Sequence, residues 1–302
     1  MNDTCLSFNL DNNIFRGRIV RLDHVLQEIF SHRQYPDNVA AAVAETTVLG
    51  VVLASLMKFD GLFTLQMQGD GPLSVLVTDV SSAGKIRSCA KYDGEAIEKM
   101  QVLRKTTGTI EPAPHWLGNG SLIFTVDQGK NTEMYQGDVD LQGKNLTECA
   151  LRYFKNSEQI DTYLRLFSQK NAKGLWQAGA LLLQKMPVVG GTAASEDNQE
   201  KIAALWEEDK ILSDSLKQEE MFDENLRMED ILFRLFHEHQ VRVVKEDDFT
   251  FGCRCNREKL FNTLSSMSEK DIEDMSENGK ITATCNFCGQ VYSFDKSELL
   301  RH

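Results

Sequence analysis

The sequence predicts an α+β fold: an N-terminal domain of antiparallel sheet and helices, a helical linker, and a small cysteine-rich C-terminal unit. Three observations lead to this prediction. Strand-like stretches come in runs, with helical stretches grouped between them. A strongly acidic, helical segment follows proline and paired glycines. Four of the seven cysteines lie after residue 250. The length of 302 residues has room for about two ordinary domains.

Three successive strands are predicted at residues 62–69, 73–80 and 85–92. A Gly-Asp-Gly-Pro turn joins the first two and a Ser-Ala-Gly turn joins the next pair, which predicts an antiparallel meander. No helix start and no Lys-Ser/Thr pair follows the first turn, so a phosphate-binding loop is not expected there. The apolar positions expected on the buried face of the first strand are Phe63, Leu65 and Met67.

The same domain contains further predicted elements. Strands are expected at residues 121–127 and 134–141, and a long helix is expected from Asp37 to about Lys58. Asp37 follows a proline and is a suitable N-cap for that helix. Proline and two glycines interrupt regular structure at residues 186–192. We therefore place the core domain at residues 1–190.

The charge of the chain is concentrated in one short segment. The chain has 33 basic and 45 acidic residues, a net charge of −12, which argues against a general nucleic-acid binder. Residues 1–195 have a net charge of −1 and residues 231–302 a net charge of −2. The remaining 35 residues, 196–230, hold 13 acidic and 4 basic side chains, a net charge of −9. The acidity is therefore a property of the segment after the core domain.

Residues 191–236 form the predicted linker. Its apolar residues recur at mostly helical spacing, which predicts two or three amphipathic helices. Clustered like charges repel one another and lower the stability of such helices. An ordinary solvated helical face is the alternative interpretation of the same pattern. The apolar positions are Ile202, Leu205, Trp206, Leu212, Leu216, Met221, Leu226, Ile231, Leu232, Leu235 and Phe236.

We expect a cytoplasmic protein without a membrane partner. The N-terminus has no cationic start and reaches Asp11 before any apolar run, unlike a secretory signal. The longest uncharged apolar stretch, residues 48–57, is too short to span a bilayer. In a reducing compartment, clustered cysteines more often bind metal or sense redox state than form permanent disulfides.

Two close cysteine pairs near the C-terminus predict a metal site. Cys253 and Cys255 are separated by 29 residues from the pair of Cys285 and Cys288. This arrangement is typical of a closed four-thiolate zinc site, to which each pair supplies two ligands. We therefore expect one Zn²⁺ per chain in a zinc-binding domain over residues 237–302. A chance meeting of four free cysteines is the alternative, but so small a unit usually needs a covalent or metal cross-link.

The local sequence of this unit supports the zinc site. Asn278-Gly279 indicates a tight turn, residues 280–284 a strand, and Gly289 a backbone bend after the last cysteine. Asp295, with a glutamate three residues later, is an N-cap pattern for a short final helix.

The cysteine spacing also permits reversible oxidation. On a strand, residues two apart have Cα atoms roughly 6.6–6.8 Å apart, whereas a disulfide prefers about 5.5–6 Å. Cys253 and Cys255 can therefore form a bond only if the backbone bends, and a strained disulfide is easily reduced. Cys285 and Cys288 have the C-x-x-C spacing of redox motifs.

The remaining cysteines and histidines are not assigned chemistry. Cys5, Cys89 and Cys149 lack a close partner in sequence and are expected to be buried as small apolar residues. His237 and His239 could be spare metal ligands, but four thiolates already complete a tetrahedron, so a surface or helix-end position is preferred. No catalytic constellation is found, since the isolated histidines specify little, and we do not expect an enzyme. Those histidines are His24, His32 and His115.

Over nearly its whole length the sequence resembles the redox-regulated heat-shock holdase chaperones of bacteria, the thirty-three-kilodalton chaperonin family. The strongest match is Phe-Gly-Cys-Arg-Cys at residues 251–255 together with Cys-Asn-Phe-Cys-Gly at residues 285–289. One departure is the Gly179-Ala180 pair, where family members often have two glycines. The other matching stretches are residues 53–61, 65–73, 179–184 and 234–238.

The resemblance implies a function that spacing and charge do not supply. In that family the cysteines corresponding to Cys253, Cys255, Cys285 and Cys288 bind zinc when reduced, and the protein is inactive. Peroxide or hypochlorite under unfolding conditions forms the disulfides Cys253–Cys255 and Cys285–Cys288, releases zinc and unfolds the linker. The oxidised form dimerises and holds unfolding client proteins without ATP.

Two other functions are possible on the sequence. One is a zinc-ribbon interaction module that binds nucleic acid or a transcription partner, which the negative charge of the C-terminal segments disfavours. The other is a thiol oxidoreductase built on Cys285 and Cys288, which lacks the strand-helix-strand context of thioredoxin-like enzymes.

Overall fold

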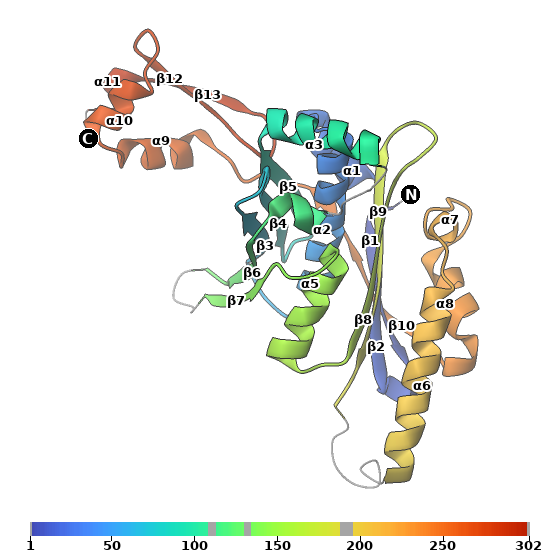
Figure 1. Cartoon of the computed structure of the whole chain (residues 1–302). Helices are drawn as coiled ribbons and strands as arrows, with labels where there is room; N and C mark the ends of the chain where they lie inside the picture. Colours follow the sequence, from blue (N-terminus) through green and yellow to red (C-terminus); the bar gives the residue numbers. More distant parts are fainter. Residues whose placement is uncertain (1, 108–112, 130–133, 188–195, 301–302) are drawn as a thin grey trace.

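The computed structural model describes residues 2–107, 113–129, 134–187 and 196–300 (Figure 1). Within these ranges the α+β prediction is confirmed: two large sheets and one small hairpin are combined with helices. The first sheet, sheet A, has the strand order β10-β1-β2-β9-β8 and is antiparallel throughout. Its strands are β1 (Thr4–Leu10), β2 (Phe15–Leu22), β8 (Thr162–Lys170), β9 (Trp176–Lys185) and β10 (Arg242–Asp248).

Sheet B contains the meander that the sequence predicts. Its order is β11-β5-β4-β3-β6-β7, antiparallel except for the short parallel pairing of β11 with β5. The three apolar residues expected on the inner face of β3 are fully buried, and the turn expected at residues 69–72 joins β3 to β4. The strands are β3 (Leu62–Gly69), β4 (Leu73–Ser81), β5 (Lys85–Tyr92), β6 (Gly120–Asp127), β7 (Tyr135–Asp140) and β11 (Thr250–Phe251).

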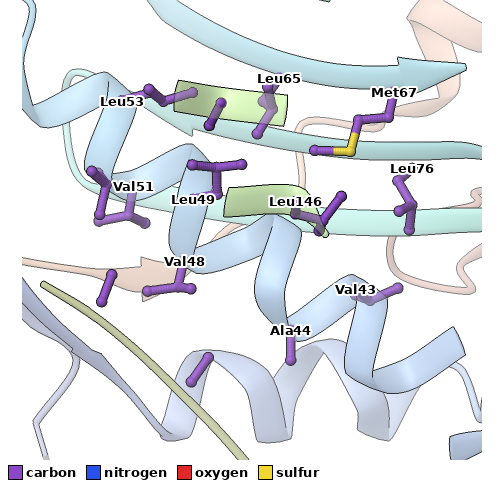
Figure 2. Close-up of a cluster of buried hydrophobic side chains, with 14 of the residues drawn as sticks. Val43, Ala44, Val48, Leu49, Val51, Leu53, Leu65, Met67, Leu76 and Leu146 are labelled. Atoms are coloured by element: carbon purple, nitrogen blue, oxygen red, sulfur yellow. The ribbon is translucent and has the colours of Figure 1, made fainter. Parts of the chain in front are cut away.

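Helix α2 (Asp37–Ser55) is the centre of the main core and packs against both sheets (Figures 1 and 2). Its apolar residues meet side chains of β3 and β4 on one side and of β9 on the other. The expected N-cap was wrong by one residue: Pro36 occupies the cap, and Asp37 is the first helical residue, paired with Lys170 at 2.6 Å. By length and composition α2 could cross a membrane, but 78% of its most apolar window is buried inside the protein. It is therefore a core helix.

Other helices cover the edges and ends of this core. The boundary expected at residues 186–192 lies mostly outside the described residues. The remaining helices of the N-terminal part are α1 (His24–His32), α3 (Gly94–Thr107), α4 (Ala113–Leu117) and α5 (Leu146–Tyr153), with the short helical turn η1 (Asp11–Asn13) between β1 and β2.

The linker forms three helices, in agreement with the prediction of two or three. They are α6 (Glu196–Asp214), α7 (Gln218–Met221) and α8 (Met228–Phe236). They lie on the face of sheet A that is turned away from α2 (Figure 1). A turn, η4 (His237–His239), then leads the chain back into β10 and β11, so residues 242–251 pair with both large sheets.

The C-terminal cysteine unit extends from one end of the molecule (Figure 1). It contains α9 (Arg257–Ser265), α10 (Glu269–Asp274), a hairpin of β12 (Lys280–Thr284) and β13 (Val291–Asp295), and α11 (Lys296–Leu299). The predicted turn is confirmed, since Asn278 and Gly279 both have positive φ, 52° and 76°. The predicted cap of the final helix is also confirmed, as Asp295 and Glu298 form a capping box.

Candidate metal centre and the linker interface

Two loops bring the four C-terminal cysteines together. Cys253 and Cys255 lie in the irregular segment between β11 and α9, and Cys285 and Cys288 lie in the connection from β12 to β13. The amide of Gly289 donates a hydrogen bond to the Cys285 carbonyl oxygen at 2.9 Å. Gly289 has a φ of 66°, a conformation that glycine adopts without the cost that other residues have. The bend predicted after the last cysteine is therefore present.

The four thiol groups are arranged as the corners of a metal site. All four Sγ atoms lie within 4.8 Å of one another. Cys253 Sγ is 3.6 Å from Cys285 Sγ, and Cys255 Sγ is 3.4 Å from Cys288 Sγ. Zinc bound to four sulfurs at about 2.3 Å has tetrahedral edges of roughly 3.8 Å. The four sulfurs and their spacing therefore fit a zinc ion. Each of the two sulfur contacts joins one cysteine from each loop.

The thiols influence one another's protonation. Burial raises the pKa of Cys253, but hydrogen bonds from the Cys255 amide, the neighbouring thiols and Arg87 outweigh it and lower this pKa to about 7. Burial raises the pKa values of Cys255 and Cys288 above that of an ordinary thiol. Crowded thiols thus lose one proton readily and the others with difficulty. A divalent cation supplies the positive charge that several thiolates at this spacing need.

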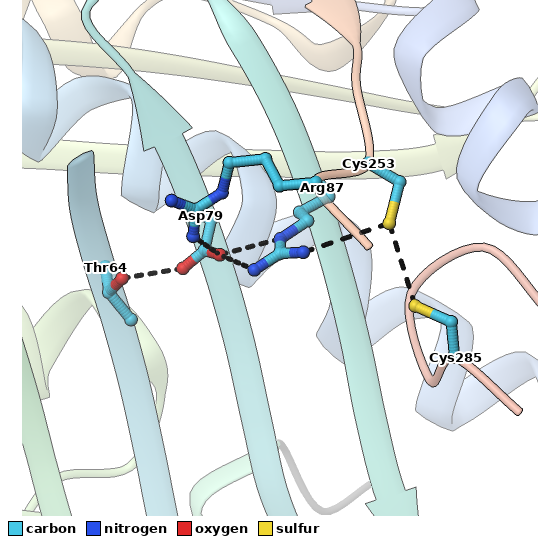
Figure 3. A network of polar contacts seen from close by, with 6 residues as sticks. Thr64, Asp79, Arg87, Cys253 and Cys285 are labelled. Carbon is cyan, nitrogen blue, oxygen red and sulfur yellow. Dashed lines mark hydrogen bonds and ion pairs between the residues drawn. The ribbon is translucent and has the colours of Figure 1, made fainter. Parts of the chain in front are cut away.

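The first cysteine loop is attached to sheet B by a partly buried charge network (Figure 3). Asp79 on β4 accepts hydrogen bonds from Arg87 on β5 at 2.6 and 2.7 Å. The same carboxylate pairs with Arg254, between the two cysteines, at 3.1 Å. Arg87 also donates to Cys253 Sγ at 3.8 Å and lies 4.0 Å from the ring centre of Phe287. The guanidinium of Arg87 therefore contacts both cysteine loops and ties them to the sheet.

The cysteine unit has only a small apolar core of its own. Five buried side chains form it, with a few partly buried neighbours. So small a core seldom supports a fold without a cross-link. The five residues are Leu264, Ile272, Ile281, Phe294 and Leu299.

The linker, by contrast, covers sheet A with a large apolar interface. Phe8 on β1 stacks on Phe236 of α8 with ring centres 5.9 Å apart, and Phe15 on β2 stacks on Trp206 of α6 at 5.6 Å. Gly179 on β9 lies against α7, where an added Cβ would come within 2.7 Å of a Met221 side-chain atom. The linker side chains buried in this interface are Ile202, Trp206, Leu216, Met221, Phe222, Met228, Ile231, Leu232, Leu235 and Phe236.

Two arginines of sheet A bind the acidic linker through its backbone. Arg165 on β8 donates from Nη1 to the carbonyl oxygens of Ser213, Asp214 and Leu216, at 3.2, 2.9 and 3.0 Å. These carbonyls lie at the C-terminal end of α6, where a cation offsets the helix dipole. Arg21 on β2 donates in the same way to carbonyl oxygens of the α7–α8 connection, at 3.0 and 3.4 Å. Both arginines were missed in the sequence, because an arginine inside a strand gives no local sign of its partner.

The remaining cysteines are buried, as predicted. Burial raises the pKa values of Cys5, Cys89 and Cys149 to about 11, so these thiols stay protonated and unreactive near neutral pH. For His239 the surface prediction was wrong, although the helix-end prediction was right. The imidazole is buried against carboxylates from η1 and α6, which supply the polar partners that allow its burial. His237 is exposed.

Comparison with known proteins decides the family. The family model described as Hsp33 protein matches residues 3–295. The chain is 32% identical over 300 residues to the 33 kDa chaperonin of Caulobacter vibrioides, which covers 98% of this chain and 95% of that protein. The chain belongs to the Hsp33 family. It is also 33% identical over 301 residues to the 33 kDa chaperonin of Aliivibrio fischeri, covering 99% of this chain and 94% of that protein.

The fold is also that of an Hsp33 protein. The crystal structure of the 33 kDa chaperonin from Thermotoga maritima matches with a TM-score of 0.77 at 21% identity, covering 99% of this chain and 97% of the other. The chain is thus a member of the Hsp33 chaperone family that carries a four-cysteine cluster able to hold a metal ion. The predicted family and fold are confirmed.

Proposed function

We propose that this chain is a redox-regulated, ATP-independent holdase chaperone that is inactive while its four cysteines are reduced and hold one Zn²⁺. The observation that carries the proposal is the combination of a small cysteine unit able to hold a metal ion with a linker that covers an apolar sheet face. The ligands are Cys253, Cys255, Cys285 and Cys288.

Oxidation converts the four thiolates into two disulfides, Cys253–Cys255 and Cys285–Cys288. Two molecules of hydrogen peroxide accept four electrons from the four thiolates; with four protons they become four water molecules, and the zinc ion is released. Two sulfur contacts in the reduced fold, 3.6 and 3.4 Å long, join cysteines of different pairs, whereas a disulfide needs a sulfur–sulfur bond of about 2.05 Å. Bonding within the pairs therefore requires the tetrahedral arrangement to break, so the disulfides and the metal site exclude each other.

Loss of the metal site then frees the linker. The charge network joins Cys253 to Arg87 and Asp79, and β10 and β11 join the cysteine unit to η4 and the linker. When the linker leaves sheet A, it exposes apolar side chains on both surfaces, and such patches bind the apolar segments of partly unfolded proteins. The sheet residues involved are Leu6, Phe8, Leu10, Phe15, Ile19, Phe167, Leu181 and Leu183.

The proposal includes the working state of the protein. We expect an oxidised homodimer that acts on unfolding clients in the cytoplasm, binds neither nucleic acid nor membranes, and catalyses no reaction. The net charge of −9 on residues 196–230 supports the exclusion of nucleic acid, because phosphate binding needs basic surface.

The decisive experiment compares reduced, zinc-loaded protein with peroxide-treated protein in preventing aggregation of a thermally unfolding client. We expect suppression only after oxidation, release of about one zinc per chain as four thiolates imply, and reversal by a dithiol with added zinc. Mass spectrometry should find the two disulfides, and a Cys149→Ala variant should behave like the parent. Equal, weak suppression by both forms would overturn the proposal.

A further inference from the structure

A second group of metal-ligating side chains lies where the linker meets the N-terminal hairpin. All of its residues precede β10 in the sequence, whereas the four cysteines follow β10. Asp11 comes from η1, Asp209 from α6 and His239 from η4. His239 Nδ1 is 3.2 Å from Asp11 Oδ2 and 3.2 Å from Asp209 Oδ1. The other ring nitrogen, Nε2, lies 3.6 Å from Glu208 Oε1. The three groups from η1, α6 and η4 lie within 4.8 Å of one another.

The burial of this cluster leaves negative charge without a matching donor. Asp209 is 0% exposed, and neither of its carboxylate oxygens accepts a hydrogen bond from any described residue. His239 is 4% exposed, and its Nδ1 carries at most one proton for two carboxylates. A buried, unpaired carboxylate is costly, so the cluster lacks a positive charge.

We propose that Asp11, Asp209 and His239 form a second metal site that binds one divalent ion of the zinc class, independent of the four cysteines. The donor set of one imidazole nitrogen and two carboxylate oxygens suits zinc, whose bonds to these atoms are about 2.0–2.2 Å long. Tetrahedral edges for such bonds are roughly 3.3–3.6 Å. The two separations of 3.2 Å from His239 Nδ1 are close to that range.

Glu208 supports this arrangement from outside the ligand set. A metal-bound histidine usually donates its second ring N–H to a carboxylate, which fixes the tautomer and the orientation of the ring. Glu208 Oε1 lies 3.6 Å from Nε2 of His239 and would accept that bond after a small movement of its side chain, which leaves Nδ1 to face the ion. An ion pair alone would need a protonated imidazole shared among three carboxylates.

The site would connect the first linker helix, and the turn that follows the last one, to the core. Asp209 is on its first helix, His239 follows its last helix, and Asp11 belongs to the hairpin of sheet A. A metal bound only in the closed state lowers the open population by the factor 1 + [M]/Kd, about 100-fold at a free metal concentration of 100 Kd. If the linker opens on oxidation, as proposed above, zinc at this second site opposes the opening.

Zinc stoichiometry tests the site without reference to chaperone activity. The reduced full-length chain, with its cysteine centre loaded, is dialysed to equilibrium against a zinc buffer, and bound zinc is measured by elemental mass spectrometry. We expect two zinc ions per chain, and one in the Asp209→Asn and His239→Gln variants. His237→Gln, two residues away and exposed, is the matched control and should retain two. Thiol counting confirms that all four cysteines remain reduced.

Hydrogen–deuterium exchange gives a second readout for the same proteins. Excess zinc should slow the exchange of α6 amides in the parent chain and in His237→Gln, but not in His239→Gln. One zinc per chain in the parent protein overturns the proposal without any variant, as does a folded His239→Gln chain that still binds two. Circular dichroism establishes that each variant is folded. A result of one zinc leaves the redox mechanism untouched, so the two proposals fail separately.

Discussion

The linker and the cysteine unit are held in place by different forces. The linker contributes ten of the 18 buried side chains that form its interface with sheet A, whereas the cysteine unit has five buried side chains in its own core. Apolar burial needs no cofactor, but a unit with so little of it usually needs a metal or covalent cross-link. In the proposed mechanism, oxidation would act on the part with the smaller apolar core, and the linker would be released through its connections to that part.

Metal removal tests this difference most strongly. Zinc in small structural sites is worth about 10–16 kcal/mol at neutral pH, similar to the whole stability of a domain. Chelation of the reduced protein should unfold residues 257–299 while the amides of sheet A and α8 keep their protection. Hydrogen–deuterium exchange with and without chelator measures both regions at once. Persistent protection of α9, α10 and α11 after verified zinc loss would show that the small core suffices.

Docking of the linker on sheet A should instead be weakened most by loss of apolar packing. Phe236 is fully buried and stacks on Phe8, so Phe236→Ala should destabilise the docked linker by about 3–5 kcal/mol. Phe233 lies on the same helix and is 65% exposed. Phe233→Ala is therefore the matched control, with an expected change within about ±0.5 kcal/mol. Exchange rates of α8 amides in the reduced, zinc-loaded proteins report the result.

The same variants separate linker opening from zinc release. Phe236→Ala should suppress client aggregation to a measurable extent without oxidant and without losing zinc. If it opens the linker but remains inactive, the apolar face of sheet A is not sufficient for client binding.

The polar attachment of the linker should be weaker than its packing. Arg165→Ala removes one Nη1 group that three carbonyl oxygens at the end of α6 share, and a hydrogen bond to a charged group contributes about 1.5–3 kcal/mol net. We expect a smaller destabilisation than for Phe236→Ala, localised to the end of α6 and to α7. Arg152→Ala, on the exposed face of α5, is the control. Proteolysis rates within residues 210–224 distinguish them, and equal rates would assign the attachment to packing alone.

The two large sheets differ in how well the sequence predicts them. The predicted strands of sheet B alternate polar and apolar residues because one face is covered by α2 and the other is partly open, as in β3. In β9 eight consecutive residues are buried, because α2 covers one face and the linker the other. A strand buried on both faces loses its alternation, and β9 was not predicted for that reason.

The cysteine site and the other polar clusters also differ in how well the sequence predicts them. The four-cysteine site could be predicted from the sequence because its ligands are all cysteines, occur in close pairs and are positioned by local turns. The charge network of Asp79 and Arg87, and the cluster of Asp209 and His239, join residues that are distant in sequence or unremarkable in type. Likewise, the sequence of the acidic segment did not indicate that one of its carboxylates, Asp209, is buried. Net charge describes a segment but does not say which of its charges are buried.

Ionic strength should have the smallest effect. Residues 196–230 have a net charge of −9, and their mutual repulsion is screened as the Debye length falls from about 10 Å at 0.1 M to 3 Å at 1 M salt. Proteolysis of the linker in the reduced protein should slow with added sodium chloride, by no more than about 1 kcal/mol in effective stability, since exposed charges interact weakly. Salt also weakens attractive interactions. The contacts of Arg21 with the linker carbonyls are buried, so salt weakens them less than it weakens the repulsion between surface charges.

A variant identifies the charges responsible for the salt effect. Glu219 and Glu224 are exposed on the linker, so Glu219→Gln/Glu224→Gln should protect the linker at low salt and reduce its response to added salt. If both proteins respond equally, the salt effect arises from stronger apolar packing, which concentrated salts also favour. In that case the linker resembles any other apolar interface, and its acidity has no part in its release.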